Sequence, residues 1–486
     1  MHVVWFRNDL RTTDHAALTA ALAAGPAVAV FLWAGQQWRS HDVGPPRLAF
    51  LRRCLESHAA ELDTLNVPLL VLDAPVFADA PELLARLCSH IGATTVHAIE
   101  EFPLNERVRD SAVANRLAAD GVRFELHEGG AILPPGAVMK DGGDPYTVFT
   151  PFKRRWAAQL HEGARTPLPK PAAQPQQPRL PRQWPELPLV TSNCLNLKQA
   201  FDGIDADLFA THWPGGAPEA QRRLAHFAEG VIEGYATDRD LAAEPGTSAL
   251  SPYLSIGALS GRTALALAIS ANDGRLLNGA DGPSTWITEL VWRDFYRHVI
   301  VHFPHVSKHR AFKPDTENVP WRTDPEALAA WQEGRTGYPM VDAGMRQLNG
   351  TGWMHNRLRM ICAMFLSKHL LLDWRRGERY FMERLVDGDF AANNGGWQWS
   401  ASTGTDAVPY FRIFNPTTQA ERFDPQGTFI RTWVPELDAL APLLEGRRKK
   451  QFFEPWSAAA PPAGYPTPIV DHKQARERAL AAFKGL

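Results

Sequence analysis

The first 130 residues alternate short apolar runs with stretches of helical periodicity. HVVWF, AVAVFLW, VPLLVLD, TTVHAIE and RFELH are typical of strands, and segments such as AALTAALAA and PELLARLCSHIG separate them as helices. Apolar strands that alternate with helices are typical of a parallel sheet covered on both faces. We therefore predict a doubly wound α/β domain over residues 1–130. Neither GxGxxG nor GxxxxGK[ST] occurs, so no common phosphate-binding fingerprint accompanies this sheet.

The composition changes after this region. Residues 167–188, PLPKPAAQPQQPRLPRQWPELP, contain too many prolines for a helix or a sheet ladder. We predict that residues 131–216 form a long proline-rich connector laid over the surface. From residue 217 to residue 486 the pattern becomes helical, beginning with one helix over EAQRRLAHFAEGVIEGYATDRD. An all-helical C-terminal domain is therefore expected.

Bulk properties narrow the classes of function. The net charge of −2 over 486 residues gives no global basic signature, so any nucleic-acid surface must be local. Cys54, Cys88, Cys194 and Cys362 form no CxxC pair and are typical of reduced thiols in a cytosolic protein. We find neither a signal peptide nor an apolar run long enough to span a bilayer, so we predict a cytoplasmic protein.

Hydroxyl side chains precede an apolar helix in TSALSPYLSIGALSGRTALALA. Thr247, Ser248 and Ser251 have the residue types that cap a helix N-terminus. The same arrangement of backbone N–H groups also binds a pyrophosphate. Both interpretations stay open from the residues alone.

The next helix, TWITELVWRDFYRHVIVHF, carries a mixed stripe. Glu289, Trp292, Arg293 and Tyr296 are spaced i, i+3, i+4 and i+7, which places them along one side of the helix. A core helix rarely places a glutamate beside a tryptophan unless a polar group meets it.

Residues 336–415 combine large aromatic residues with amides, carboxylates and small residues. Leu358, Ile361, Phe365 and Leu372 recur as a core face. A second face carries Asn356 and Arg359, and a third carries Arg357 and Met360. The following segment contains Asp387, Asp389, Asn393 and Asn394 immediately before Trp397. Such a composition favours a cavity for a flat ligand, oriented by a few polar groups.

The sequence contains neither a common metal-binding motif nor a common motif of a catalytic nucleophile. HEGAR and HEGGA lack the second histidine of a zinc helix, and no G-x-S-x-G elbow occurs. His355 alone is more typical of a structural residue than of a ligand. A flavin suits the aromatic, amide-rich cavity, since it needs hydrogen-bond partners on its pyrimidine edge and a tuned group at N5.

The phrases TGYPMVDAGMRQL, TGWMHNRLRM, DWRRGERYFM and DGDFAANNGGWQWSASTGTDA resemble the flavin-binding region of the photolyase/cryptochrome family. The resemblance covers most of the chain and is strongest to the class I photolyases, which repair cyclobutane pyrimidine dimers. It implies that FAD is held by Tyr235, Thr247, Ser248, Leu250, Ser251, Trp286, Asn356, Arg359, Asp387 and Asp389, with Asn393 facing N5. Plant-type cryptochromes typically carry an aspartate at this last position, so Asn393 favours repair.

The resemblance also implies which residues bind the DNA substrate. Glu289, Trp292, Arg357 and Met360 match residues around the dimer pocket, and Arg239 and Arg412 match contacts to the DNA backbone. A flipped-out base needs a flat wall and a hydrogen-bond partner, and photolyases are an established example of base flipping. The family's electron-transfer chain from the surface to the flavin coincides with Trp321, Trp374 and Trp397.

The N-terminal domain would bind a light-harvesting antenna. His41, Asn105, Glu106 and Lys308 match residues that bind methenyltetrahydrofolate in the folate-type members. Ser307 departs from the cysteine that some folate binders carry, which leaves a deazaflavin or an empty antenna site as alternatives. Ala249 replaces an arginine of some relatives without affecting the flavin prediction.

The expected activity is that of a light-driven carbon–carbon lyase. Excited reduced FAD would donate an electron to a flipped-out pyrimidine dimer in DNA, the ring would open, and the electron would return. The main alternative is a cryptochrome-type blue-light photoreceptor, which shares the fold, the flavin and the tryptophans. Repair of (6-4) photoproducts, a single-strand-preferring cryptochrome and an unrelated flavin oxidoreductase are further alternatives. The protein is expected to be a monomer that acts on DNA without a membrane.

Overall fold

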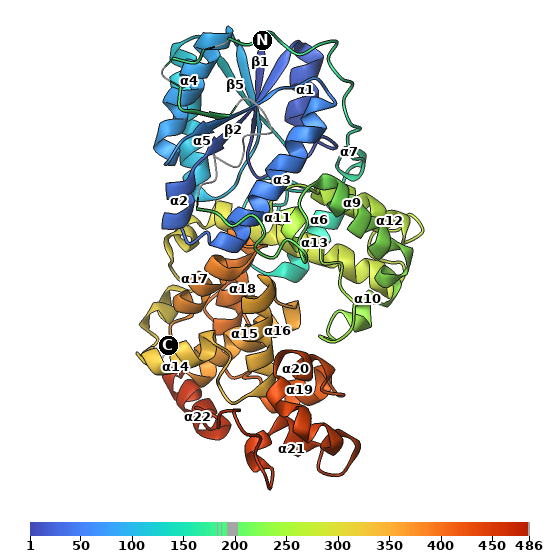
Figure 1. Cartoon of the computed structure of the whole chain (residues 1–486), viewed down its shortest axis with the longest axis vertical. Coiled ribbons are helices and arrows are strands. Elements are labelled where there is room, and N and C mark those ends of the chain that lie inside the picture. Colours follow the sequence, from blue (N-terminus) through green and yellow to red (C-terminus); the bar gives the residue numbers. More distant parts are fainter. Residues whose placement is uncertain (182, 186, 192–202, 485–486) are drawn as a thin grey trace. The chain divides into compact units, whose positions relative to one another are not determined.

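The computed structural model describes residues 1–181, 183–185, 187–191 and 203–484. The chain divides into two compact units, each of which is described by itself (Figure 1). The first unit contains Met1–Glu233, Ser248–Pro304 and Val386–Ala391, and the second contains Gly234–Thr247, His305–Leu385 and Ala392–Leu486. The division of the chain into segments 1–130, 131–216 and 217–486 stays a prediction of domain organisation.

The sheet of the first unit has the strand order β5-β4-β1-β2-β3-β6. Its strands are β1 (His2–Phe6), β2 (Ala27–Trp33), β3 (Leu69–Asp73), β4 (Thr95–Ile99), β5 (Arg123–His127) and β6 (Leu189–Thr191). Strands β1 to β5 are parallel, as predicted from the alternating pattern. The sixth strand is a difference: β6 pairs antiparallel to β3 directly after the proline run. Three residues are too few to give a strand pattern in the sequence.

Helices cover both faces of this sheet, which confirms the doubly wound arrangement (Figure 1). The face that includes Val3, Trp5 and Val30 packs against α4 (Ala80–Ile91) and α5 (Leu104–Ala119) in one apolar cluster. The opposite face packs against α1 (Ala16–Ala24). On that face the Phe6 ring also meets His58 of α3 (Pro45–Asp63) edge-on, with ring centroids 4.4 Å apart.

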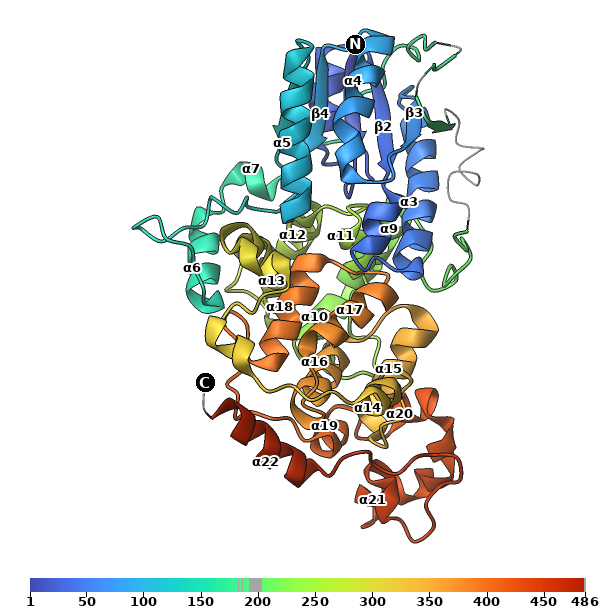
Figure 2. The same cartoon turned by 90° about the vertical axis from the view of Figure 1, so that its left-hand side faces the viewer.

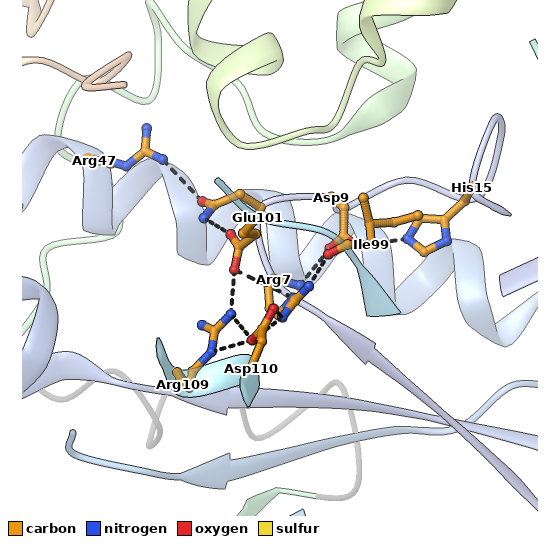
Figure 3. A network of polar contacts seen from close by, with 9 residues as sticks. Arg7, Asp9, His15, Arg47, Ile99, Glu101, Arg109 and Asp110 are labelled. Carbon is orange, nitrogen blue, oxygen red and sulfur yellow. Dashed lines mark hydrogen bonds and ion pairs between the residues drawn. The ribbon is translucent and has the colours of Figure 1, made fainter. Parts of the chain in front are cut away.

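The strand order reverses between β1 and β4, so the carboxyl ends of these two strands form a switch point, where open α/β sheets bind ligands. In this structure a polar network occupies that edge (Figure 3). Arg7 Nη1 donates to Asp110 at 2.8 Å, and Asn8 Nδ2 donates to Glu101 at 2.7 Å. Arg47 Nη2 of α3 donates to Asn8 Oδ1 and Nη1 to Ser255 Oγ, which ties the edge to the helices of this unit.

The first unit contains further helices. They are α2 (Gly35–Ser40), η1 (Phe77–Asp79), α6 (Phe149–Gln159), α7 (Glu162–Arg165), α9 (Ala217–His226), η3 (Phe227–Val231), α11 (Ser251–Ser255), α12 (Gly261–Ser270) and α13 (Asp281–His302). Gly257, at φ +69°, follows α11 where a side chain would collide with the main chain of Asn8 and Asp9. Only glycine allows this close approach.

The helix predicted over EAQRRLAHFAEGVIEGYATDRD is interrupted. Gly230 leaves helical geometry at φ 158°, and a π-helical turn separates α9 from α10 (Ile232–Asp238). A glycine inside a helical pattern lowers the cost of such a break, because its backbone is less restricted.

The second unit is helical, as predicted. Its elements are η5 (Pro314–Asn318), α14 (Pro325–Gln332), α15 (Pro339–Thr351), α16 (Asn356–Met364), η6 (Phe365–His369), α17 (Trp374–Arg384), α19 (Pro416–Phe423), α20 (Thr428–Trp433), η7 (Pro435–Glu445), α21 (Lys450–Phe453), η8 (Pro455–Ser457) and α22 (His472–Phe483). Three elements, α10, η4 (Pro304–Lys308) and α18 (Phe390–Ala401), begin in the first unit and continue into the second. Helix α15 packs against α16, α19 and α20 (Figure 2).

The core of the second unit contains the predicted apolar face. Leu358, Ile361, Phe365 and Leu372 are all buried in one cluster. Cys54, Cys88 and Cys362 are buried free thiols, whereas Cys194 lies outside the described residues. Among the described helices, none has the length and apolar character needed to cross a membrane.

Candidate functional site

Helix α13 presents an aromatic platform in the first unit. The ring of Trp292 lies parallel to that of Phe149, with centroids 3.5 Å apart and planes 6° apart. Tyr296, one helical turn further on, stacks against the same indole at 5.6 Å. Glu289 precedes Trp292 by three residues on α13. The predicted stripe therefore exists, and Phe149 of α6 extends it.

Two carboxylates precede α18 in the same unit. Asp387 is buried, and Asp389 forms an ion pair with Arg297 of α13 at 3.5 Å. Burial lowers the pKa of Arg47, and the nearby charges of Asp389 and Asp387 partly oppose that shift. These carboxylates thus lie among arginines that fix their positions.

One of the two interpretations of the hydroxyl-rich segment was that it caps the following helix, α11. The structure does not show such a cap. Leu250 occupies the N-cap position and makes no side-chain cap bond, and Ser251 is the first helical residue. Ser260 caps the following helix, α12, by accepting from the backbone N–H of Thr263 at 3.0 Å. Ser248, Leu250 and Ser251 belong to the first unit, and Thr247 belongs to the second.

Trp286 lies near the start of α13 and is buried. Its ring packs at a tilt against Phe227, with centroids 5.0 Å apart. An indole at this place supplies a rigid apolar wall.

The predicted polar pair, Asn356 and Arg359, lies on α16 in the second unit. His355 caps this helix, since Nδ1 accepts from the backbone N–H of Arg357 at 3.2 Å. Burial lowers the pKa of His355 to about 4, so this cap is neutral near pH 7. Arg359 Nε donates to the Met354 carbonyl at 2.8 Å, which turns its guanidinium toward the helix start, where Asn356 is the first helical residue.

Glu378 of α17 orients both amides of α18. Asn393 Nδ2 donates to the Glu378 carbonyl at 3.0 Å, and Asn394 Nδ2 donates to its carboxylate at 2.9 Å. Gln398 Nε2 donates to Asn394 Oδ1 at 2.9 Å, and its own Oε1 accepts from the Phe312 N–H. Asn393 is therefore held with a known orientation, because its amide nitrogen faces a carbonyl.

A second cationic group lies in the same unit. Arg357 Nη2 forms an ion pair with Asp240 at 2.6 Å, and Nη1 lies 3.9 Å from Met360 Sδ. Asp240 also approaches Arg239, whose guanidinium lies over the Tyr235 ring at 5.4 Å. Asp240 thus lies beside two residues predicted to contact DNA, Arg357 and Arg239.

The three predicted relay tryptophans belong to one apolar cluster of the second unit. Trp397 and Trp374 are buried, whereas Trp321 is half-buried at the margin of the cluster. The Trp397 ring packs edge-on against Phe381 at 4.9 Å and Trp331 at 6.0 Å. Within the described residues, the indole nitrogens of Trp397 and Trp321 are buried without a hydrogen-bond partner.

Arg412 lies on an exposed turn of the second unit. Its neighbours Tyr410 and Phe411 expose 40% and 59% of their surface, which is unusual for large apolar residues. A cation beside exposed aromatic rings is a composition that nucleic-acid surfaces use.

The residues predicted to bind the antenna chromophore belong to both units. His41 follows α2 and is exposed, with Nδ1 2.8 Å from the Gln37 carbonyl. Asn105 and Glu106 begin α5 at the carboxyl end of β4. Burial, with repulsion from Glu101, raises the pKa of Glu106. Lys308 belongs to the second unit.

Comparisons with known proteins show the family of this chain. Residues 2–174 match the family model "DNA photolyase", and residues 286–485 match "FAD binding domain of DNA photolyase". The deoxyribodipyrimidine photo-lyase of Escherichia coli strain K12 is 44% identical over 99% of this chain and 98% of that protein. The chain belongs to the DNA photolyase family.

Solved photolyase structures share the whole fold. A bacterial class III photolyase from Agrobacterium tumefaciens is 35% identical and covers 100% of this chain and 97% of its own, with a TM-score of 0.86. An archaeal photolyase from Sulfolobus tokodaii with two FAD molecules is 29% identical and covers 100% of both chains, with a TM-score of 0.81. The two FAD molecules of that archaeal protein imply a novel light-harvesting cofactor there.

Two residues of the site were missed from the sequence. Phe149 lies in the predicted connector, and nothing in its local pattern points to Trp292, which lies far along the chain in a different helix. Glu378 stands inside DWRRGERYFM, where a charged residue on a helix suggests a solvent-exposed side chain. Its burial at 3% exposure marks it as a positioning residue.

Proposed function

We propose that this photolyase-family chain is a light-driven DNA repair enzyme, a deoxyribodipyrimidine photo-lyase of the class I type. Its substrate is a cyclobutane pyrimidine dimer flipped out of DNA, which it splits to two pyrimidines. The name of the E. coli relative, 44% identical along the full length, supports this substrate. The single observation that carries the proposal on the structural side is the amide of Asn393, held in a defined orientation by Glu378.

The residues of this chain fit a reduced flavin. Asn393 uses its amide nitrogen on the Glu378 carbonyl, and within the described residues no hydrogen bond to its Oδ1 is found. That oxygen is the acceptor that N5–H of a reduced flavin requires, and an amide offers no acidic proton in return. Asn356, Arg359, Asp387 and Asp389 would hold the rest of the cofactor, with Tyr235, Thr247, Ser248, Leu250, Ser251 and Trp286. Reduced FAD supplies, when bound, the photoexcited electron that opens the cyclobutane ring and returns afterwards.

The substrate side is assigned to Glu289 and Trp292 of α13, with Arg357 and Met360 of α16. Phe149 and Tyr296 hold the Trp292 ring in one plane, so the indole offers a rigid wall at little entropic cost. The carboxylate of Glu289 can accept hydrogen bonds from the N–H edges of the bases. Arg239 and Arg412 are assigned to phosphates.

Trp321, Trp374 and Trp397 are proposed as the path by which an electron reaches an oxidised flavin. Burial decreases from Trp374 and Trp397 to Trp321, as a path from the interior toward the surface requires. Neither end of this path takes part in dimer splitting, which uses the electron of the flavin itself.

Methenyltetrahydrofolate is the proposed antenna, held by His41, Asn105, Glu106 and Lys308. The Sulfolobus tokodaii structure, with its two FAD molecules, makes a second FAD an explicit rival, beside a deazaflavin or no antenna. Mass spectrometry of the chromophores released from the purified protein decides among them, and two equivalents of FAD per protein, or a deazaflavin beside one FAD, would reject folate. Monomeric state and a cytoplasmic location are predictions that accompany the proposal.

The test of the proposed function is repair itself. Protein with chemically reduced FAD is mixed with duplex DNA that contains one dimer, and one half is illuminated with blue light. We expect dimer loss in the illuminated half alone. Intact dimers in both halves, from a preparation that still binds FAD and changes its spectrum in light, would favour a cryptochrome-type photoreceptor instead.

A further inference from the structure

Three imidazoles and a carboxylate meet on one face of the N-terminal sheet, away from every residue assigned above. His97 of β4 lies directly opposite Glu125 of β5 in the parallel register, and His127 follows two residues after Glu125. Alternate residues of a strand share a face, so all three side chains lie on the same side of the sheet. His2 of β1 lies on that side too, since it pairs with Thr95, two residues before His97.

The distances among these groups are those of metal ligands. His97 Nδ1 is 3.0 Å from His127 Nε2 and 3.4 Å from Glu125 Oε2. One ligand atom from each of the three lies within 4.8 Å of the others. Two ligands of a tetrahedral zinc, each about 2.0–2.2 Å from the ion, lie about 3.3–3.6 Å apart. Small side-chain rotations therefore suffice to place an ion between them.

The other ring nitrogen of His97, Nε2, has a hydrogen-bonding neighbour in His2. His97 Nε2 lies 3.1 Å from His2 Nδ1. In the tautomer that carries its N–H at Nε2, His97 donates to His2 and keeps the lone pair of Nδ1 for a ligand. Metal-binding histidines use their other nitrogen in this way.

The carboxylate is oriented by a cation. Arg123 Nη1 lies 3.4 Å from Glu125 Oε1, while Oε2 faces His97. The cluster opens toward solvent on the side of β5, which is an edge strand, and both Glu125 and His127 are half-buried. A metal ion therefore has an entry path, and water has a place as the fourth ligand.

We propose that His97 Nδ1, His127 Nε2 and Glu125 bind one divalent transition-metal ion of the zinc class, with His2 as a positioning residue. Two imidazoles and one carboxylate are a ligand set that zinc accepts with an open fourth position. No ligand of the proposed flavin or DNA sites takes part, so the site is independent of the proposed function. The ion replaces the proton that the nitrogens of His97 and His127 otherwise share.

Isothermal titration of the full-length protein with ZnCl₂, free of any polyhistidine tag, tests the proposal. We expect one equivalent of zinc to bind and to raise the melting temperature, because a ligand that binds the folded state stabilises it. His127→Ala and Glu125→Gln, both at half-buried positions, should abolish the one-equivalent binding and the zinc-dependent shift. His212→Ala removes an exposed histidine outside the cluster and should leave both unchanged.

His2 is tested by a pair of variants. His2→Ala should weaken zinc binding about 10–100-fold, as loss of an outer hydrogen-bond partner does. His2→Asn keeps an acceptor near Nδ1 and should restore most of the affinity. The proposal is overturned if the wild-type protein binds no zinc at one equivalent, or if His127→Ala and Glu125→Gln bind it as the wild type does.

Discussion

Glu378 supports two neighbouring amides of α18, one through its side chain and one through its main chain. Its carboxylate holds Asn394, its carbonyl holds Asn393, and His309 Nδ1 lies 3.6 Å from its second oxygen. A carboxylate that is 3% exposed is costly unless such partners satisfy it. The carboxylate therefore fixes Asn394, whereas the main-chain carbonyl of Glu378 holds Asn393, the amide that faces the flavin in the proposed function.

Glu378→Ala keeps the main-chain carbonyl that holds Asn393, but it leaves Asn394 Nδ2 buried without an acceptor one residue further on. The variant should therefore lower stability by about 1–3 kcal/mol and weaken FAD binding through the disturbed start of α18. Glu378→Gln keeps an acceptor and should recover most of both. FAD affinity is measured by quenching of flavin fluorescence, and stability by thermal melting, with the exposed Glu445→Ala as control. Unchanged FAD affinity in Glu378→Ala would remove Glu378 from the site.

Lys368 is a buried cation in the second unit. Its Nζ lies 3.5 Å from the centroid of the Phe483 ring, and it has no hydrogen-bond partner among the described residues. Burial, with a smaller repulsion from Lys313, lowers the pKa of Lys368 from 10.5 to about 7. Between these two values the unfolded chain holds a proton that the folded chain lacks, so this group makes stability rise with pH.

Lys368→Met should raise the melting temperature at pH 7, because a residue of similar length removes the cost of burying an amine. The advantage of the variant should shrink as the pH rises from about 7 toward 10.5, where the wild-type amine becomes neutral in both states. Melting curves at several pH values measure this. An advantage that grows with pH would contradict the assigned pKa direction.

At the scale of elements, the packing of α17 against α18 positions Trp397, one of the three tryptophans proposed for electron transfer. A side chain at Gly377 would collide with the ring of Trp397, so this glycine lets the indole lie directly against α17. Phe381 and Trp331 enclose the same ring. Trp397 is thus held rigidly, which serves electron transfer and packing equally well.

Trp397→Phe separates these two roles. We expect light no longer to reduce oxidised FAD in the variant, whereas dimer repair by chemically reduced enzyme persists, since repair needs no electron from the protein. Flavin absorbance under illumination measures the first, and dimer loss the second. Equal loss of both activities would mean that Trp397 has a structural role only.

The elements themselves were largely predictable, and their mutual positions were not. The five segments predicted as strands form the five parallel strands. Strands β1 to β4 are almost wholly buried, which leaves a continuous apolar signal in the sequence. Strand β5, RFELH, is a partly exposed edge strand that mixes polar and apolar residues. Strand β6 is three residues long and gave no strand pattern, and the break at Gly230 needed the observed backbone. The contacts of Phe149 with Trp292 and of Glu378 with Asn394 join distant segments, and no local pattern encodes such pairs. The flavin-binding residues stay a prediction, which came from the family motifs because periodicity gives no indication of them.

On the scale of the whole molecule, a net charge of −2 means that DNA must be held by a few local cations. Arg412→Gln should weaken damaged and undamaged duplexes alike and reduce the log–log salt dependence by about one unit. Trp292→Ala should instead cost about 1–3 kcal/mol on dimer-containing DNA and spare undamaged DNA. Titration of both duplexes at several salt concentrations measures this. Equal weakening of the two duplexes by Trp292→Ala would contradict the pocket assignment.

In the proposed function, the reduced flavin donates an electron to the dimer and receives it back after the ring has opened. The most direct test of this central claim is a turnover count, made without oxygen and without remaining reductant. The pre-reduced protein is illuminated with a large excess of dimer-containing DNA, while the flavin spectrum is recorded. We predict that each enzyme molecule splits many dimers and that its FAD is still reduced at the end. Repair that stops after one dimer per flavin, with the flavin oxidised, would contradict the account.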